Sequence, residues 1–473
     1  MTTRRPSTRT LTSIPARDLG ATLKRLRTSN TATARQYPGE TGDRQPMHTV
    51  YGGAHLFRSD TARKMGSVAL AVLDEYAPDA DALARTFGLV DRFGDAAGPP
   101  FAATVRARVV EKLGREPVED FRIDFEDGYG IRPDTEEDEH AQVAAEQVAE
   151  GLRAATLPPF IGIRIKPMSQ ELHQRSLRTL DLFTTTLLRR TSGRLPPNFV
   201  VTVPKIMAPG QVSAVASACD ALERALRLRR GTLALELMIE APQSILAADG
   251  SSALRSLVAA GGGRVTGAHF GTYDYTALCG ITAAWQHMRH AACDFAKHMM
   301  LVALAQTGIR LSDGATNVMP IAPHRGATLT DAQLSENRVI VEGAWRRHFD
   351  DVQHSLVNGF YQGWDLHPAQ LPSRFTAVYA FFLAARPAAT ARLRNFVDKA
   401  AQATLVGDVF DDAATGQGLL NFFVRGLTCG ALTLEEAQET GLTVEELRGR
   451  SFVKVLDARK RQVASGFSRK APS

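Results

Sequence analysis

The stretch LALELMIE at residues 233–240 is a short apolar run that ends in an acidic residue. Two runs upstream, FIGIRIK at 160–166 and FVVTVPKI at 199–206, are also apolar and carry basic residues near their ends. Short runs of this kind, rich in Ile and Val and separated by helical stretches, indicate a repeated strand–helix unit with a parallel sheet. The sequence therefore predicts an α/β fold.

Eight such runs recur, and the other five are HTVYGGAHLF (48–57), FRIDFED (121–127), RVTGAHFG (264–271), ATNVMPI (315–321) and GWDLHP (363–368). Eight strands, most followed by a helix, predict a (β/α)8 TIM barrel, and a doubly wound sheet is the alternative. The barrel is favoured because ionisable residues come at or near the carboxyl ends of the predicted strands, where a barrel builds its active site. These residues are Glu126, Asp127, Arg164, Lys205, Glu240, Asp274 and His367.

We expect three regions along the chain. Residues 1–45 form a basic, flexible and partly disordered N-terminal tail, with one short helix around Leu19, Leu23 and Leu26. Residues 46–375 form the catalytic barrel. Residues 376–473 form a helical C-terminal extension that carries a lid or oligomerisation loop.

The composition, 44% hydrophobic and 22% charged over 473 residues, is that of a globular protein. Residues 1–45 hold nine Lys or Arg against three acids, which accounts for the whole net charge of +6. The positive charge therefore belongs to the tail, and neither nucleic acid nor a membrane is expected as a partner. We expect a cytoplasmic protein; an organelle transit peptide is the alternative reading of the tail. The four Cys stand too far apart in sequence to suggest a zinc site or a disulfide framework.

Two acids mark the ends of consecutive predicted strands. Glu240 closes LELMIE, and Asp274 follows VTGAHFGTY about one strand–helix unit later. Two carboxylates at neighbouring strand tips suit one hard cation such as Mg²⁺, with water or substrate oxygens completing the coordination. Capping of the next helix, or pairing with a basic neighbour, is the structural alternative for each acid.

Two basic residues, Arg164 and Lys205, and the acidic run DFED at 124–127 accompany this pair of carboxylates. Arg164 in IGIRIKP offers a planar fork suited to a carboxylate or an enolate oxygen, or it bridges Asp124 or Glu126 on the preceding strand. Both readings are compatible, because a pairing that fixes the guanidinium also preorganises it. Lys205 in VTVPKI either holds a substrate oxygen or neutralises the acids.

Six motifs in order carry a family resemblance: DFEDG, GIRIKP, VPKI, ELMIEAP, GAHFGTYDYTA and GWDLHPAQ. Together they resemble the aldolase/citrate lyase β-subunit family, which includes malyl-CoA lyases and is related to malate synthases. The resemblance runs from about residue 120 to residue 412. The sequence differs from the family pattern in its first strand and in about 30 extra residues between the Asp274 and His367 motifs. No segment has a recognisable CoA-binding motif.

The resemblance implies a phosphoenolpyruvate-type barrel that makes or breaks a C–C bond beside a carbonyl, with Mg²⁺ as cofactor. It implies that Glu240 and Asp274 ligate the metal, that Glu126 and Asp127 contact metal-bound water, and that Arg164 stabilises the enolate or carbonyl oxygen. It also implies an acid/base Asp in a C-terminal loop, often from a neighbouring subunit of a trimer or hexamer. The segment TLVGDVFDD resembles that loop, which makes Asp411 the candidate, with Asp412 and Asp408 as competitors and an acidic surface turn as the alternative.

The sequence thus predicts a Mg²⁺-dependent carbon–carbon lyase or condensing enzyme. Its substrate is a 2-oxo acid and the corresponding aldol or malyl-type adduct, with or without a CoA thioester. The alternatives are an acyl-CoA adduct hydrolase or phosphoenolpyruvate-type enzyme on the same barrel, and a non-catalytic barrel that binds a metabolite.

Overall fold

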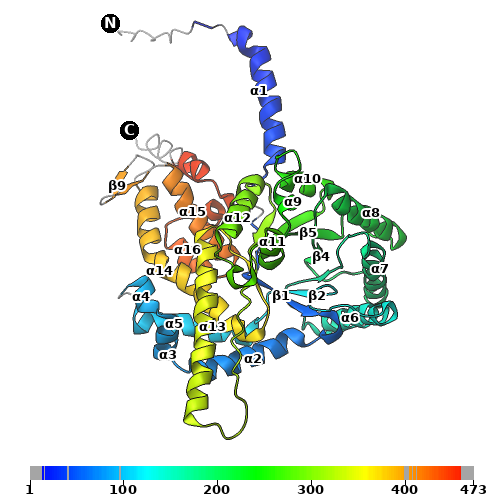
Figure 1. Cartoon of the computed structure of the whole chain (residues 1–473). Helices are drawn as coiled ribbons and strands as arrows, with labels where there is room; N and C mark the ends of the chain where they lie inside the picture. The colour runs from blue at the N-terminus through cyan, green and yellow to red at the C-terminus, as the bar shows by residue number, and fades with distance from the viewer. Residues whose placement is uncertain are drawn as a thin grey trace, which may run out of the picture.

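The computed structural model describes residues 13–14, 16–39, 42–94, 97–398, 404–406, 409–411 and 413–459. At its centre lies an eight-stranded parallel sheet with the order β7-β6-β5-β4-β3-β2-β1-β8 (Figure 1). The strands are β1 (His48–Gly53), β2 (Asp120–Asp124), β3 (Phe160–Arg164), β4 (Phe199–Val203), β5 (Ala234–Ile239), β6 (Val265–Phe270), β7 (Arg310–Ser312) and β8 (Gly363–Asp365).

The sheet closes between its two edge strands. The backbone N–H of Asp313 donates to Gln362 O at 2.9 Å, and the N–H of Trp364 donates to Gly314 O at 3.1 Å. Ala315 also forms a parallel bridge with Trp364. These contacts join the end of β7 to β8, so the predicted (β/α)8 barrel is confirmed.

Helices connect successive strands and surround the barrel (Figure 1). Between β1 and β6 they are α2 (Thr61–Tyr76), α3 (Ala80–Phe87), α4 (Leu89–Phe93), α5 (Pro99–Arg115), α6 (Asp134–Ala154), α7 (His173–Arg190), α8 (Pro209–Ala225), α9 (Pro242–Ile245) and α10 (Ala253–Ala260). After β6 follow α11 (Thr272–Leu278), α12 (Ala291–Leu304), α13 (Asp331–Val357) and α14 (Leu371–Asp398). Short 3₁₀ helices occupy Ala54–Leu56, Ala283–Trp285 and Pro368–Gln370.

The two faces of the strands differ in chemistry because side chains alternate along a strand. Phe121 and Ile123 of β2 belong to the apolar core, whereas the alternate residue Arg122 forms an ion pair across the barrel with Glu236 of β5 at 3.1 Å. The barrel interior therefore contains paired charges, and the helices pack on an apolar outer surface.

The C-terminal extension continues directly from the barrel, because α14 spans the predicted boundary at residue 375. It comprises a short antiparallel pair, β9 (Thr404–Val406) and β10 (Val409–Asp411), and the helices α15 (Ala413–Thr428), α16 (Leu434–Gln438) and α17 (Val444–Gly449). The rings of Phe382 on α14 and Phe422 on α15 lie 5.2 Å apart. Apolar packing therefore holds the extension against the barrel's last helix.

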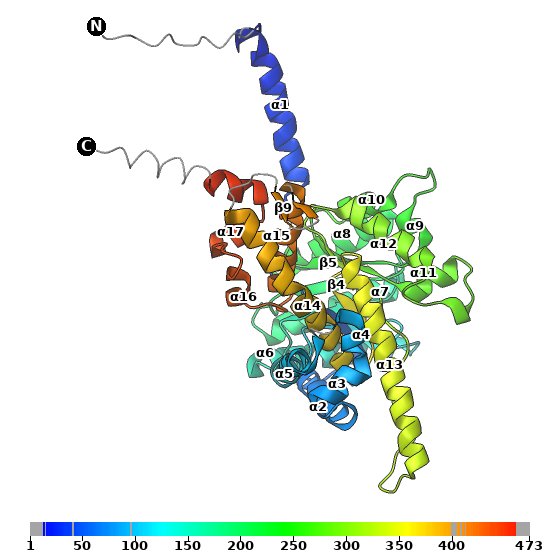
Figure 2. The same cartoon turned by 90° about the vertical axis from the view of Figure 1, so that its left-hand side faces the viewer.

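The N-terminal region contains a longer helix than expected. Helix α1 (Ala16–Gln36) extends over 21 residues and projects away from the barrel (Figure 1, Figure 2). Its described side chains are exposed, including Leu19, Leu23 and Leu26. The lack of Pro between residues 16 and 37 lets the helix continue beyond the leucines.

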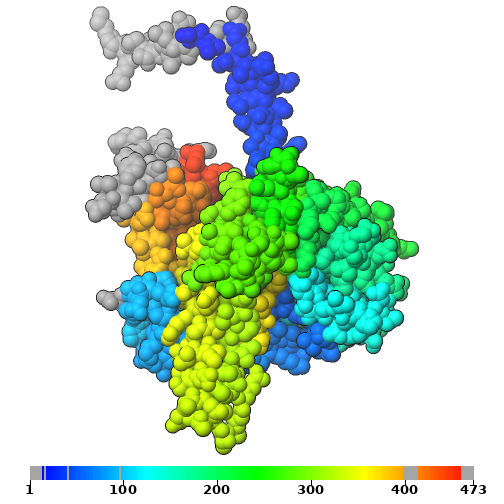
Figure 3. Space-filling view, viewed as in Figure 1, coloured from blue at the N-terminus to red at the C-terminus, as the bar shows by residue number. Residues whose placement is uncertain are grey.

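One predicted strand is wrong. The segment 315–321 is not a strand beyond the single bridge at Ala315, and β7 lies just upstream at Arg310–Ser312. Thr316 donates its hydroxyl to Asp351 of α13 at 2.8 Å, and Pro320 cannot donate to a strand ladder. The chain therefore leaves the sheet here and enters the loop before α13. That loop and the first half of α13 project from the barrel (Figure 3).

None of the helices in the described part of the chain combines the length and the apolar character that crossing a bilayer requires.

The close packing of β3 against β4 yields a stability prediction. A Cβ on Gly162 would collide with the backbone oxygen of Val200, whereas a Cβ on Gly114 of α5 would meet nothing within 4 Å. We expect Gly162→Ala to lower the free energy of unfolding by about 1–3 kcal/mol. Gly114→Ala, the matched control, should leave it unchanged or raise it by about 0.4–1 kcal/mol. Thermal and urea unfolding measure both, and equal stability of the two variants would contradict the packing described.

Candidate active site

Asp124, the last residue of β2, organises the loop that follows. Its carboxylate accepts hydrogen bonds from the backbone N–H groups of Glu126 at 2.9 Å and Gly128 at 2.7 Å. A Cβ on Gly128 would lie 2.6 Å from Asp124 Oδ2, so only glycine fits at this position. Asp124 thereby fixes the turn that presents Glu126 and Asp127 at the carboxyl end of the barrel.

The same carboxylate holds Arg164, the last residue of β3. The guanidinium donates from Nε to Asp124 Oδ1 at 2.7 Å and from Nη2 to Oδ2 at 2.6 Å, a bidentate pairing. Its remaining nitrogen, Nη1, lies 3.1 Å from Glu126 Oε2. The expected bridge between Arg164 and the preceding strand is therefore present, and it fixes the guanidinium at the site.

Two aromatic rings flank the guanidinium of Arg164. Its central carbon lies 4.8 Å from the centroid of Tyr51 on β1 and 5.4 Å from that of Trp364 on β8. Neither residue was predicted as part of the site. These contacts favour the charged form of a side chain that is only 2% exposed.

Lys205 joins the acids of three strand ends. Its Nζ forms ion pairs with Glu126, with Asp127 at 3.0 Å and with Asp274 at 3.7 Å. Its backbone N–H donates to Glu240 Oε1 at 2.7 Å. Both of the predicted metal ligands therefore lie against the same residue, one at its backbone and one at its side chain.

The backbone of Lys205 adopts an unusual conformation. Its φ is +50°, in the left-handed region that a non-glycine residue avoids at a cost of about 1–3 kcal/mol. This conformation follows β4 after Pro204 and directs the N–H of Lys205 toward Glu240.

Glu240 and Asp274 reach the site from different local structures. Glu240 directly follows β5 and is 1% exposed, whereas Asp274 lies in the first turn of α11, after β6. Gly271, the residue between β6 and α11, leaves the space that Glu240 fills, because a Cβ there would collide with the Glu240 carboxylate. The glycine of HFGTYD thus has a steric role that the sequence alone did not reveal.

The crowding of acids shifts their proton affinities. Burial, followed by the charge of Asp274, raises the pKa of Glu240 to about 8, and burial also raises the pKa of Asp274. Burial raises the pKa of Glu126 to about 7, against the opposing charge of Arg164. For Asp127, burial acts upward, but its hydrogen bond with Glu126 and the charges of Arg164 and Lys205 lower its pKa overall.

A second buried layer supports the site from below. Tyr51 Oη lies 3.1 Å from His269 Nδ1, and His269 Nε2 lies 3.0 Å from Glu236. Glu236 in turn pairs with Arg122. The sequence feature that could have identified this buried layer is the alternation of polar residues along strands that are otherwise apolar.

The remaining predicted residues are Asp411, with its competitors Asp408 and Asp412, and His367. The backbone of Asp411 lies in β10, but its side chain, together with Asp408 and Asp412, lies outside the described residues. His367 Nδ1 accepts a hydrogen bond from the N–H of Ala369 at 3.1 Å and caps the 3₁₀ helix Pro368–Gln370, a structural contact.

Within the residues that the structure describes, no three or more His, Cys, Asp or Glu side chains are grouped so as to hold a metal ion. A metal here would rest on two carboxylates, Glu240 and Asp274, with the other coordination positions left to water and substrate.

Two solved structures are similar to this chain. A citrate lyase from Burkholderia xenovorans LB400 superposes with a TM-score of 0.50 at 17% identity, over 72% of this chain and 93% of that one. A magnesium/glyoxylate complex of Haloferax volcanii malate synthase gives a TM-score of 0.44 at 15% identity, over 87% of this chain and 97% of that one. The similarity to the citrate lyase supports the barrel, and at 17% identity it is evidence for the fold alone.

Comparison with curated proteins gives no significant match. One family model, described as a domain of unknown function (DUF6986), matches residues 26–455. That match takes in the whole barrel and nearly all of the described extension. The chain therefore belongs to the DUF6986 family.

Proposed function

We propose that this protein is a Mg²⁺-dependent carbon–carbon lyase or condensing enzyme. It acts on a 2-oxo acid and the corresponding aldol or malyl-type adduct, with or without a CoA thioester. The observation that supports this proposal most is the meeting of four carboxylates and two cations at the carboxyl end of one barrel. The acids come from the ends of three strands, and Lys205 contacts all four of them.

The donor set fits a hard divalent cation. Glu240 and Asp274 offer only oxygen, the ligand atom that Mg²⁺ prefers. The pKa of each is raised, that of Glu240 by burial and the charge of Asp274, and that of the half-buried Asp274 by desolvation and the charge of Asp127. A cation placed between them would remove the cost of ionising both. When bound, Mg²⁺ would supply Lewis-acid polarisation of a 2-oxo acid carbonyl.

Arg164 and Lys205 supply positive charge where negative charge develops on the substrate. The Arg164 guanidinium is held on one edge by Asp124, so it needs no reorganisation during the reaction. The Lys205 ammonium extends from a backbone fixed by Pro204 and Glu240 toward the Asp127 side of the site. We propose that Arg164 stabilises the enolate or alkoxide oxygen and that Lys205 binds a substrate carboxylate oxygen.

A proton must move at the carbon beside the carbonyl. We propose Asp411 as the acid/base. It would come from the C-terminal loop of this chain or of a neighbouring copy in a trimer or hexamer. Glu126 adds a carboxyl whose pKa of about 7 suits proton exchange near neutral pH, and its buried Oε2 faces Arg164 Nη1 as an ion pair without a hydrogen bond.

Removal of either proposed metal ligand should abolish the reaction. We expect Glu240→Ala and Asp274→Ala each to lower kcat/KM by at least about 100-fold, the scale seen when one electrostatic group is lost from an active site. The assay pairs glyoxylate, pyruvate or oxaloacetate with Mg²⁺, with and without acetyl-CoA, and includes malyl-type adducts for the reverse reaction. Calorimetry of Mg²⁺ with the same 2-oxo acids provides a readout independent of turnover.

Asp249→Ala, which removes an exposed acid of the loop after α9, is the matched control and should keep full activity. Unchanged turnover in both ligand variants would refute the proposed metal role. A wild-type protein with neither turnover nor Mg²⁺-dependent binding would refute the proposed function.

The raised pKa of Glu240 predicts a stability difference that depends on pH. Between about pH 4.5 and 8 the folded chain keeps a proton on Glu240 that the unfolded chain has lost, so rising pH destabilises the metal-free protein. Glu240→Gln removes this group and can still accept the Lys205 N–H. At pH 8 without divalent ions, this variant should be more stable than wild type by up to a few kcal/mol, at about 1.4 kcal/mol per pKa unit.

The advantage of Glu240→Gln should shrink toward zero near pH 4.5. Glu111→Gln, which replaces an exposed glutamate on α5, should show no such trend. Urea unfolding at several pH values provides the measurement. Mg²⁺ should stabilise the wild type but not Glu240→Gln at pH 8; an equal difference in stability between the two proteins at every pH would contradict the assignment.

A further inference from the structure

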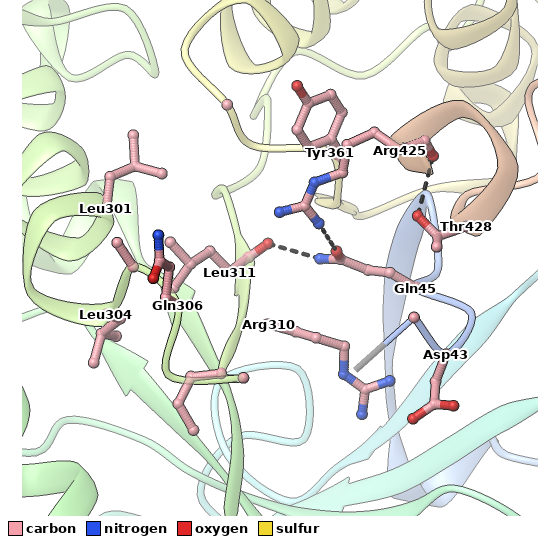
Figure 4. A pocket seen from close by; sticks show the side chains of 15 residues that line it. Asp43, Gln45, Leu301, Leu304, Gln306, Arg310, Leu311, Tyr361, Arg425 and Thr428 are labelled. Carbon is pink, nitrogen blue, oxygen red and sulfur yellow. Dashed lines mark hydrogen bonds between the residues drawn. The ribbon is translucent and has the colours of Figure 1, made fainter. Parts of the chain in front are cut away.

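Figure 4 shows a pocket of about 210 Å³. It includes Arg310, the first residue of β7, and therefore lies at the end of the barrel opposite the candidate active site. Four parts of the chain line it: residues 42–45, which lead into β1; residues 301–311, which run from α12 into β7; residues 359–361, before β8; and residues 425–428 of α15. Its volume is below the roughly 300–1,000 Å³ of pockets for drug-sized ligands, so it suits a small molecule.

The pocket is rich in positive charge. Arg310 from the first position of β7 and Arg425 from α15 both line it, against one acid, the exposed Asp43. Leu301, Leu304 and Leu311 supply apolar wall. This lining matches a ligand that combines a negatively charged group with a short hydrocarbon part.

Arg310 differs from the arginines of the protein core. Within the described part of the chain it forms no ion pair; it is half-buried, donates one long hydrogen bond of 3.4 Å to Arg44 O, and lies 5.4 Å from the ring centroid of Phe160. Each of the buried arginines, in contrast, pairs with a carboxylate: Arg122, Arg164, Arg175, Arg264 and Arg374. Arg310 therefore has unused capacity for an oxyanion.

The second arginine is preorganised beside it. Arg425 Nη1 donates to Gln45 Oε1 at 3.1 Å, and Gln45 Nε2 donates to Leu311 O at 3.0 Å. The guanidinium of Arg425 also stacks on Tyr361, 5.0 Å from the ring centroid. Figure 4 shows this chain of contacts along one wall of the pocket.

We propose that this pocket is a binding site for a small oxyanion, held by Arg310 and Arg425. The ligand is a short organic carboxylate or a phosphate. Since the pocket lies at the amino ends of the strands, the ligand does not take part in the chemistry at Glu240 and Asp274. It joins the barrel to the C-terminal extension, because one arginine comes from each.

The test measures binding of sodium succinate and of sodium phosphate by calorimetry and by thermal shift, with sodium chloride at matched ionic strength. We expect the wild type to bind at least one of the two anions and to gain thermal stability with its concentration. The two anions separate a carboxylate ligand from a phosphate ligand. Arg310→Gln should raise the Kd at least about tenfold, and Arg310→Lys should give an intermediate value because it keeps the charge but loses the fork.

Arg255→Gln is the matched control. Arg255 is also half-buried, and it donates to Tyr37 Oη at 2.9 Å and to Ala303 O at 3.3 Å outside the pocket lining, so its loss should leave the Kd unchanged. Asp274→Ala, altered at the opposite end of the barrel, should also bind like wild type, which separates this site from the candidate active site. Circular dichroism checks the fold of each variant. Absence of binding by the wild type, or equal binding by folded Arg310→Gln, would overturn the proposal.

Discussion

The bidentate pairing of Asp124 with Arg164 is the contact on which the candidate site depends. Both side chains are almost fully buried between β2 and β3. A pair of this kind gains little net stability, but removal of one partner leaves an uncompensated charge and typically costs about 3–5 kcal/mol. Asp124 also accepts from the backbone of the following loop, so one carboxylate fixes both the guanidinium and the acids beside it.

The charges beneath this pairing explain how a barrel with a polar interior remains stable. Inward positions on β2 and β5 carry Arg122 and Glu236, which satisfy one another across the barrel, while the outward positions on the same strands are apolar. His269 and Tyr51 connect this lower layer to Arg164. The site is therefore supported by a network of paired groups, which limits the freedom of each member.

Much of this arrangement was predictable from the sequence. The apolar runs predicted most of the strands. The acids and bases at their ends predicted a shared site at one end of a barrel, because parallel strands bring their carboxyl ends together. The seventh strand was missed because β7 is only three residues long and its neighbour, ATNVMPI, has the more strand-like composition. The length of α1 was missed because leucine spacing marks an apolar face and not the end of a helix.

Other features depend on three-dimensional contacts that no local pattern encodes. The left-handed backbone of Lys205 and the steric need for Gly271 are both matched to Glu240, which directly follows β5. From the sequence, Lys205 could equally bind a substrate oxygen or neutralise the acids. Only the fold reveals that it contacts acids from the ends of three strands. The pocket at Arg310 and Arg425 unites residues more than a hundred positions apart, so sequence inspection gave no reason to pair them.

A crystal structure with Mn²⁺ as a scattering substitute for Mg²⁺, together with a 2-oxo acid, tests the proposed metal site most directly. We expect one anomalous peak bound by the carboxylates of Glu240 and Asp274, with Arg164 still paired to Asp124. An ion bound elsewhere would contradict the proposed metal site. So would a site that holds no ion at saturating Mn²⁺ and in which the Lys205 ammonium is the only cation that faces these acids.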